Sequence, residues 1–425
     1  MKNNEPSPLP SNESAVLHRS LKSLPHNVTS ASGSYLTLDN GCKILDACGG
    51  AAVAVIGHGN AEVMHAAVAQ MREYTTSAAE RLAKCILEPL PSSTYFDHGL
   101  TKVYLVGSGS EANDAALKCA KQYWFEQGEP QRKVYVTREQ AYHGGTIGAM
   151  SISAFVNRLV LEIEQVFERV GAKNTISFSG ESVSGAALGS MLAPQGYWPA
   201  VRALCDKHGI LLHLDEVMCG MGRTGTYFAF EQEGIKPDIV TIGKGLGGGF
   251  APISAMIVND KVLGALRRGT SSFNHGHTFQ AHAMCCAIAL QVQRIVKRQQ
   301  LVERCAEMGD KLAKLLDEAF HGAKHVAERR GRGLFQSVEF MLDPRTKTPF
   351  SKDIEFGAKI QLATFDLGVA VYPGAGTVDG VVGDHVLVAP PYTVSDEELE
   401  LTVKALRKAY NEVVWVLFRA QDLKL

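Results

Sequence analysis

Two short apolar runs lie close together in the middle of the chain, and chemically reactive residues follow each of them. The run at residues 210–214 leads to Asp215, and the run at 239–242 leads to Lys244 and the sequence GLGGG. Runs of this length and composition are typical of buried strands. Because ligands of open α/β sheets bind beyond the carboxyl ends of the strands, we expect the acid and the lysine to face one crevice.

A glycine–serine turn at residues 107–110 separates an apolar run at 102–106 from a long helical run. The first N–H groups of a helix lack partners within the helix, and the helix dipole favours negative charge there. Gly109 would let a phosphate approach the backbone, and the hydroxyls of Ser108 and Ser110 would add donors. An ordinary helix cap over a flexible turn would use the same residues, so the turn alone leaves both interpretations open.

An aromatic residue, Tyr142, follows the predicted strand at 133–137 and precedes two glycines. At such a junction an aromatic ring can stack on a planar cofactor, although Tyr–His pairs are more often packing or surface features. The acid, the lysine, the phosphate turn and the aromatic ring are all predicted at strand ends. In combination they favour a pyridoxal 5′-phosphate site and no metal site.

Composition narrows the class of protein. A chain of 425 residues with 45% hydrophobic residues can bury a large core. Its 43 basic and 44 acidic residues give no electrostatic reason to expect nucleic acid as a partner, and no apolar run is long enough to cross a membrane. The N-terminus has no apolar signal-peptide core, and the nine cysteines are scattered, so we expect a cytoplasmic protein.

The order of predicted elements indicates an α/β protein with two domains. A polar, proline-rich start predicts a disordered segment at 1–20, and a predicted hairpin lies within an N-terminal segment, 21–60, that packs with the small domain. Residues 61–300 are predicted to form a large domain with a mostly parallel sheet. Residues 301–425 are predicted to form a smaller α+β domain that ends in a long helix.

Five motifs in this order resemble the class III aminotransferases, which are pyridoxal phosphate enzymes of fold type I. The motifs are GSGSEANDAALK, AYHGGT, LDEVMCGMGRTG, PDIVTIGKGLGGG and GHTFQAHAMCCAIAL. The resemblance extends from about Leu36 to the C-terminal helix. It implies a seven-stranded, mostly parallel sheet in the large domain, and a homodimer with active sites at the subunit interface.

The resemblance also implies roles for individual residues. Lys244 would form the Schiff base with the cofactor and then shuttle a proton. Asp215 would keep the pyridine nitrogen protonated, so that the ring withdraws electrons from the substrate. The other cofactor-binding residues would be Ser108, Gly109 and Ser110 at the phosphate, Tyr142 and Val217 on the ring, Glu181 near its edge, and Thr278 reaching the phosphate of the partner subunit. Arg223 is predicted to be structural, and His58, His143 and His277 are predicted to pack or face solvent.

The chain departs from the family pattern at segments that would shape the substrate pocket. The region after residues 151–153 is short, and the following strand, TISFSGE, is unusually polar, with Ser182 where proline is common. The stretch at 71–79 is also short. The sequence VLVAPPYTV has no arginine where some members bind a carboxylate, so the sequence does not choose between amines and amino acids.

The predicted function is therefore transamination by a ping-pong cycle, from an amine or amino acid donor to an oxo acceptor. Lys244 and Asp215 would also serve a decarboxylating transaminase, a racemase or an aminomutase. A non-catalytic protein of the same fold is a third possibility, because the pocket segments are shortened.

Overall fold

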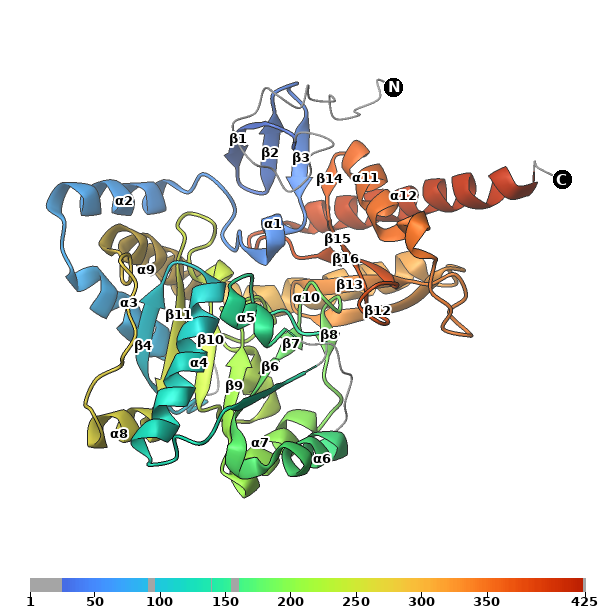
Figure 1. Ribbon diagram of the computed structural model, residues 1–425. Helices are drawn as coiled ribbons and strands as arrows, with labels where there is room; N and C mark the ends of the chain where they lie inside the picture. The colour runs from blue at the N-terminus through green and yellow to red at the C-terminus, as the bar shows by residue number, and fades with distance from the viewer. Residues whose placement is uncertain (1–24, 91–95, 139, 154–159, 423–425) are drawn as a thin grey trace, which may run out of the picture.

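A computed structural model describes residues 25–90, 96–138, 140–153 and 160–422 (Figure 1). The predicted disordered segment at 1–20 lies outside the described residues. Among the helices in these ranges, none combines the length and the apolar character that crossing a membrane requires.

A mixed sheet forms the centre of the molecule. In the described residues it has six strands in the order β4-β11-β10-β9-β6-β5. β5, β6, β9 and β10 are parallel, and β11 is antiparallel to both of its neighbours, β10 and β4. The strands are β4 (Leu100–Val106), β5 (Val134–Thr137), β6 (Thr175–Glu181), β9 (Leu211–Asp215), β10 (Ile239–Ile242) and β11 (Ser254–Asn259).

The α/β fold class is confirmed, but the predicted seven strands are not found in the described part of the sheet, where β5 is the edge strand. The physical reason is the short connection from β5 to β6. Its described residues form only α5 (Ile147–Ser151), α6 (Val160–Val170) and η1 (Ala172–Asn174). The chain thus returns to β6 through helices, without a described strand beside β5.

Both faces of this sheet are buried, which explains why its strands are continuously apolar in the sequence. On one face, Leu211 and Ile239 pack with residues of α4 (Gly109–Glu126) and α8 (Asp260–Arg268). On the other face, Leu212 and Val240 belong to the main core. The helices contributing to that core include α3 (Ser77–Leu87), α7 (Tyr197–His208), α9 (Ala283–Arg298) and α10 (Leu301–Phe320), and α2 (Ala61–Glu73) packs along α9.

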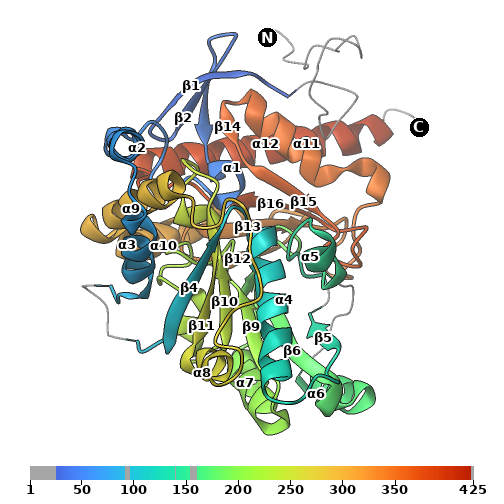
Figure 2. The same cartoon turned by 60° about the vertical axis from the view of Figure 1, so that its left-hand side comes forward.

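The N-terminal strands belong to a separate sheet, of order β1-β2-β3-β14. The predicted hairpin is present, since β2 and β3 pair antiparallel, and β3 also pairs with β14 from the C-terminal part of the chain. In both views this sheet lies beside α11 and α12 (Figures 1 and 2). The elements are β1 (Val28–Ser32), β2 (Tyr35–Leu38), β3 (Lys43–Asp46), α1 (Gly49–Ala52), β14 (Val369–Ala370), α11 (Phe356–Asp366) and α12 (Asp396–Asp422).

The C-terminal part contains a third sheet, of order β12-β13-β16-β15, in which every pairing is antiparallel. Its strands are β12 (Val326–Arg332), β13 (Phe335–Phe340), β15 (Tyr372–Ala375) and β16 (Asp384–Val388). Short elements complete the described fold: β7 (Val183–Ser184), β8 (Met191–Leu192), η2 (Ala229–Glu233), η3 (Lys244–Leu246) and η4 (Lys352–Ile354). The domain boundaries stay a prediction.

Candidate active site

A cavity of about 530 Å³ opens where the parallel strands of the central sheet end. It lies between the ends of β6 and β9, the start of η3 and the N-terminus of α4. Seven predicted site residues line it: Gly109, Ser110, Tyr142, Glu181, Asp215, Val217 and Lys244. The structure thus brings together residues that are up to 135 positions apart in the sequence, as expected of side chains at strand ends.

Asp215 is the buried acid of this cavity. Its Oδ2 accepts hydrogen bonds from His143 Nδ1 at 2.7 Å and Asn113 Nδ2 at 2.9 Å. Its Oδ1 accepts one from the N–H of Val217 at 3.0 Å. Burial would raise the pKa of Asp215, but the hydrogen bond and charge of His143 outweigh it, and the pKa lies below its usual value. Asp215 is therefore held as an anion.

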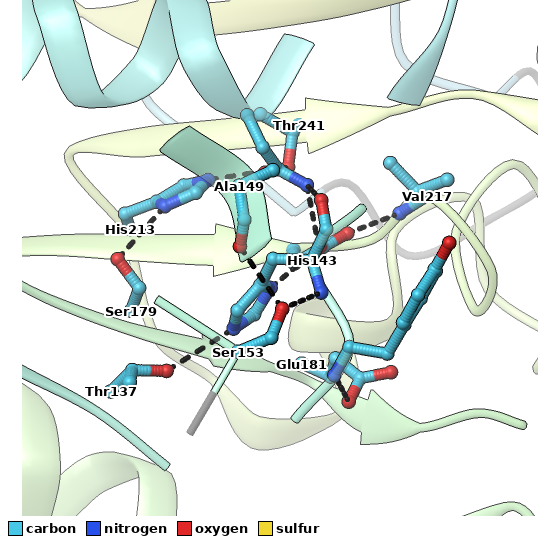
Figure 3. A network of polar contacts seen from close by, with 12 residues as sticks. Thr137, His143, Ala149, Ser153, Ser179, Glu181, His213, Val217 and Thr241 are labelled. Carbon is cyan, nitrogen blue, oxygen red and sulfur yellow. Dashed lines mark hydrogen bonds and ion pairs between the residues drawn. The ribbon is translucent and has the colours of Figure 1, made fainter. Parts of the chain in front are cut away.

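His143 was predicted to pack or to face solvent, and that prediction missed its contact with the acid. The side chain is fully buried and lies beside Asp215, while its Nε2 is 3.3 Å from the hydroxyl of Thr137 (Figure 3). Burial would lower the pKa of His143, but Asp215 raises it above its usual value. The sequence signal was its position directly after Tyr142, in a turn that enters the same crevice.

Asn113 is a second residue that the sequence did not single out. It lies four residues after Gly109, one turn into α4, and is 1% exposed. Its amide donates to the backbone oxygen of His143 at 2.6 Å as well as to Asp215. The residue thus connects the first turns of α4 to both members of the His143–Asp215 pair.

Lys244 begins the short helix η3 and has a φ of 41°, in the left-handed region that non-glycine residues seldom adopt. Its Nζ donates to the backbone oxygen of Ala51 at 3.0 Å, so α1 forms part of the site wall. Burial lowers the pKa of Lys244, although the nearby carboxylates oppose this. A larger share of the amine is therefore neutral and nucleophilic than for an exposed lysine.

Glu181 ends β6 and is a direct register partner of Asp215 on β9. Its carboxyl group accepts hydrogen bonds from Ser184 Oγ and the N–H of Gly185, both at 3.0 Å, and from the N–H of Tyr142 at 3.4 Å. Burial raises the pKa of Glu181. The two carboxyl groups at the end of the sheet therefore differ in the direction of their pKa, which is raised for Glu181 and lowered for Asp215.

The predicted phosphate turn begins α4. Ser108 is the N-cap, and its Oγ accepts from the N–H of Glu111 at 3.3 Å. The hydroxyl oxygen of Ser110 accepts from the N–H of Gly145 at 3.0 Å. Gly109 also has a packing role that the sequence did not reveal, because a Cβ there would lie 2.8 Å from Cγ1 of Val217.

The remaining predicted residues lie at the edge of the cavity or away from it. Tyr142 lines it but is 62% exposed. Among the described residues, Ser108 and Thr278 are not part of its lining, and Thr278 is exposed. A contact of Thr278 with a partner subunit stays a prediction.

The departures from the family pattern have structural counterparts. Ser182 donates its hydroxyl to Oε1 of Glu216 at 2.7 Å, a contact that proline could not make.

Arg223 is 1% exposed and donates to the backbone oxygens of Leu334 and Pro390, in agreement with a structural role. His58 lies 2.9 Å from a carboxylate oxygen of Asp46, at the start of the segment that leads to α1.

Comparisons with a family model and with known sequences all match this chain to aminotransferases. The family model described as aminotransferase class-III matches residues 16–172 and 156–410. The chain is 39% identical to an aminotransferase of Gibberella zeae, over 92% of this chain and 85% of the relative. It is 38% identical to an aminotransferase of Schizosaccharomyces pombe, over 92% of this chain and 94% of the relative.

Solved structures agree with the sequence matches. An amine transaminase from an uncultivated Pseudomonas species, solved in its pyridoxal phosphate-bound form, superposes with a TM-score of 0.86. The identity is 26%, and the match covers 95% of this chain and 100% of that structure.

Proposed function

The chain belongs to the class III aminotransferase family, and from this premise we propose that Lys244 and Asp215 carry its pyridoxal 5′-phosphate chemistry. The family assigns the reaction: a transaminase moves an amino group from an amine or amino acid to an oxo acceptor in two half-reactions. The observation that carries the residue assignment is that a half-buried amine, of Lys244, and a buried carboxylate, of Asp215, line one cavity. The alternatives of a racemase, an aminomutase or a non-catalytic protein have no comparable support.

The donor and acceptor groups around the cavity fit this cofactor. A carboxylate has about four acceptor sites. In the described residues, Oδ1 of Asp215 receives one hydrogen bond, from Val217, and keeps an acceptor site for a protonated pyridine nitrogen. Gly109 and Ser110, at the first turn of α4, would hold the phosphate, because helix N-termini favour anions. Tyr142 and Val217 would lie against the ring.

The chemistry divides between the cofactor and the chain. Once bound, pyridoxal phosphate supplies a ring that withdraws electrons from the bonds of the substrate carbon. Asp215 would hold a proton on the ring nitrogen, because His143 and Asn113 keep its carboxylate ionised and fixed. Lys244 would act as the nucleophile, and its free amine would accept and return a proton. The carbonyl of Ala51 lies where it can orient that amine.

A homodimer is part of the proposal. Apolar side chains close in sequence to predicted site residues are exposed in the single chain: Ile147, five residues after Tyr142, at 85%, and Phe279 at 72%. Phe279 follows Thr278 directly, in the segment assigned to the partner's phosphate. A second copy that covers these side chains would also enclose Tyr142. A cytoplasmic location rests on the nine cysteines, which are free in the described structure.

Absorbance spectroscopy tests the residue assignment. The purified wild-type protein should show the visible band of covalently bound pyridoxal phosphate, and Lys244→Ala should lose it. An amino donor added without an oxo acceptor should convert the band to that of the amino form. An undiminished band in Lys244→Ala, or a wild-type protein without a band, would overturn the assignment.

A further inference from the structure

A continuous chain of buried hydrogen bonds runs through the central sheet toward Asp215. His213, on β9, has Nδ1 at 3.0 Å from Ser179 Oγ and Nε2 at 3.2 Å from Thr241 Oγ1 (Figure 3). Thr241 donates to Oδ1 of Asn113 at 2.8 Å, and Asn113 donates to Asp215 at 2.9 Å. Ser179, His213, Thr241 and Asn113 are each at most 1% exposed.

The direction of every hydrogen bond in this chain follows from the charge of Asp215. A carboxylate can only accept, so the atom of Asn113 that faces it is the NH₂ group. The amide oxygen of Asn113 then faces Thr241, whose single hydroxyl proton must point to it. Thr241 therefore accepts from His213, which requires a proton on Nε2.

The far end of the chain is consistent with this assignment. Burial lowers the pKa of His213 to about 4, so the ring is neutral at physiological pH. A neutral ring with a proton on Nε2 has a bare Nδ1, and the hydroxyl of Ser179 can donate to it. Each donor thus meets an acceptor, and one tautomer of His213 satisfies the whole chain.

We propose that His213 is a positioning residue for Asp215, acting through Thr241 and Asn113. His213 lies two residues before Asp215 on the same strand and does not line the cavity, so it cannot touch the cofactor itself. By donating to Thr241 it fixes the hydroxyl rotor. That rotor supports the amide orientation of Asn113 that Asp215 and the backbone oxygen of His143 also require, with its NH₂ group facing the carboxylate. This inference rests on the proposed role of Asp215 toward the ring nitrogen.

An ordinary core histidine would be satisfied by its neighbours without influencing the carboxylate. Two features distinguish His213 from that case. First, its hydrogen bonds lead through side chains alone to the carboxylate of Asp215. Second, the amide of Asn113 also donates to the backbone oxygen of His143, and the ring of His143 is the other side-chain donor to Asp215. His325, also buried, contacts the backbone oxygen of Leu342 instead and provides a matched control.

The test compares cofactor binding by His213→Leu, Thr241→Val, the double variant and His213→Gln. The dissociation constant of pyridoxal phosphate and the position of its visible band are measured for each protein, with the melting temperature of the cofactor-free form. We expect His213→Leu and Thr241→Val each to weaken binding about 3- to 10-fold and to shift the band. The double variant should bind no more weakly than Thr241→Val, because His213 acts only through Thr241.

Rescue and control variants separate positioning from stability. His213→Gln keeps an N–H that can reach Thr241 and should restore binding to within about 2-fold of the wild type. His325→Leu removes a buried histidine elsewhere and should leave binding and band position unchanged. Wild-type binding by His213→Leu would overturn the proposal. So would a double variant weakened by the product of the two single effects.

A second measurement does not depend on cofactor binding. It therefore tests the proton positions in the hydrogen-bond chain separately from the proposed function. In cofactor-free protein with ¹⁵N-labelled histidine, His213 should show a protonated Nε2 and a bare Nδ1 at neutral pH. The His213→Gln spectrum identifies its signals by their loss. A doubly protonated ring, or a proton on Nδ1, would overturn the proposed role of His213 even if the cofactor binds as proposed.

Discussion

Glu181 and Asp215 are direct partners across the parallel strands β6 and β9, yet the pKa values of their carboxyl groups are displaced in opposite directions. Burial raises the pKa of Glu181, whereas the hydrogen bond from His143 overcomes burial at Asp215 and lowers its pKa. At Asp215, the acid with the lowered pKa, Oδ1 receives one hydrogen bond, from the N–H of Val217, and keeps an acceptor site. Two acids at one sheet edge thus suit different tasks.

Replacing Asp215 should separate binding from turnover. We expect Asp215→Ala to bind pyridoxal phosphate through Lys244 but to lose at least about 100-fold in kcat, because no anion then keeps the ring nitrogen protonated. Half-reaction rates with an amino donor measure the loss. Asp206→Ala, at an exposed carboxylate, is the control and should retain wild-type rates. Wild-type turnover in Asp215→Ala would contradict the role assigned to the acid.

Gly109 should be required for packing as well as for cofactor binding. A methyl group at this position would lie 2.8 Å from Cγ1 of Val217, so Gly109→Ala should reduce the free energy of unfolding by about 1–3 kcal/mol. Adding Val217→Ala should recover part of that loss by removing the clash. Urea denaturation of the cofactor-free proteins measures both effects.

Gly145→Ala is the matched control, since its added methyl group would meet no atom within 4 Å. It should unfold like the wild type. If Gly109→Ala were equally stable, the contact between Gly109 and Val217 would not constrain this position.

Arg223 should be a structural residue whose loss destabilises the chain. Its guanidinium donates to two backbone oxygens and lies 4.6 Å from the centre of the Tyr392 ring. We expect Arg223→Met to cost about 2–4 kcal/mol in the free energy of unfolding, because two buried carbonyl groups lose a charged donor. Arg345→Met, at a side chain that is 90% exposed, should change it by less than about 0.5 kcal/mol. Equal effects at both positions would contradict a special role for Arg223.

Much of the site could be predicted because its signals are local in the sequence. Asp215 and Lys244 lie at the ends of short apolar runs, and a glycine–serine turn before a helix is compatible with an anion site. Asn113 and His213 gave no such signal. Their importance depends on hydrogen-bond partners that are 128 and 28 residues away at Thr241, and only the order of the strands brings these residues together.

The strand count shows a second limit of the sequence. The resemblance implied seven strands, and the short region after residues 151–153 was noticed, but a short segment does not show which element is lost. The described structure places helices in the connection from β5 to β6. Ser182 is a similar case. The sequence shows a serine where proline is common, but its hydrogen bond to Glu216 could not be predicted, because it depends on how β6 and β9 end side by side.

Glu216 should make stability depend on pH near neutrality. The carboxyl group is fully buried and accepts hydrogen bonds from Ser182 Oγ and from the N–H groups of Ala229 and Phe230. Burial raises its pKa from 4.5 to about 7 in the folded protein. Between these values the folded state binds more protons than the unfolded state. The free energy of unfolding therefore falls as pH rises from about 4.5 to about 7, by roughly 3 kcal/mol from this group.

Comparison with Glu216→Gln isolates this contribution, since other titrating groups cancel in the difference between the two proteins. Glutamine does not titrate, and its NH₂ group opposes the N–H groups of Ala229 or Phe230, which adds a cost that is independent of pH. Urea denaturation at pH 5 and pH 8 should show the wild type losing part of its advantage over Glu216→Gln at the higher pH. A difference that stays constant would mean that Glu216 has the same pKa in both states. Such a result would leave its hydrogen bonds to Ser182, directly after β6, and to η2 with a structural role alone.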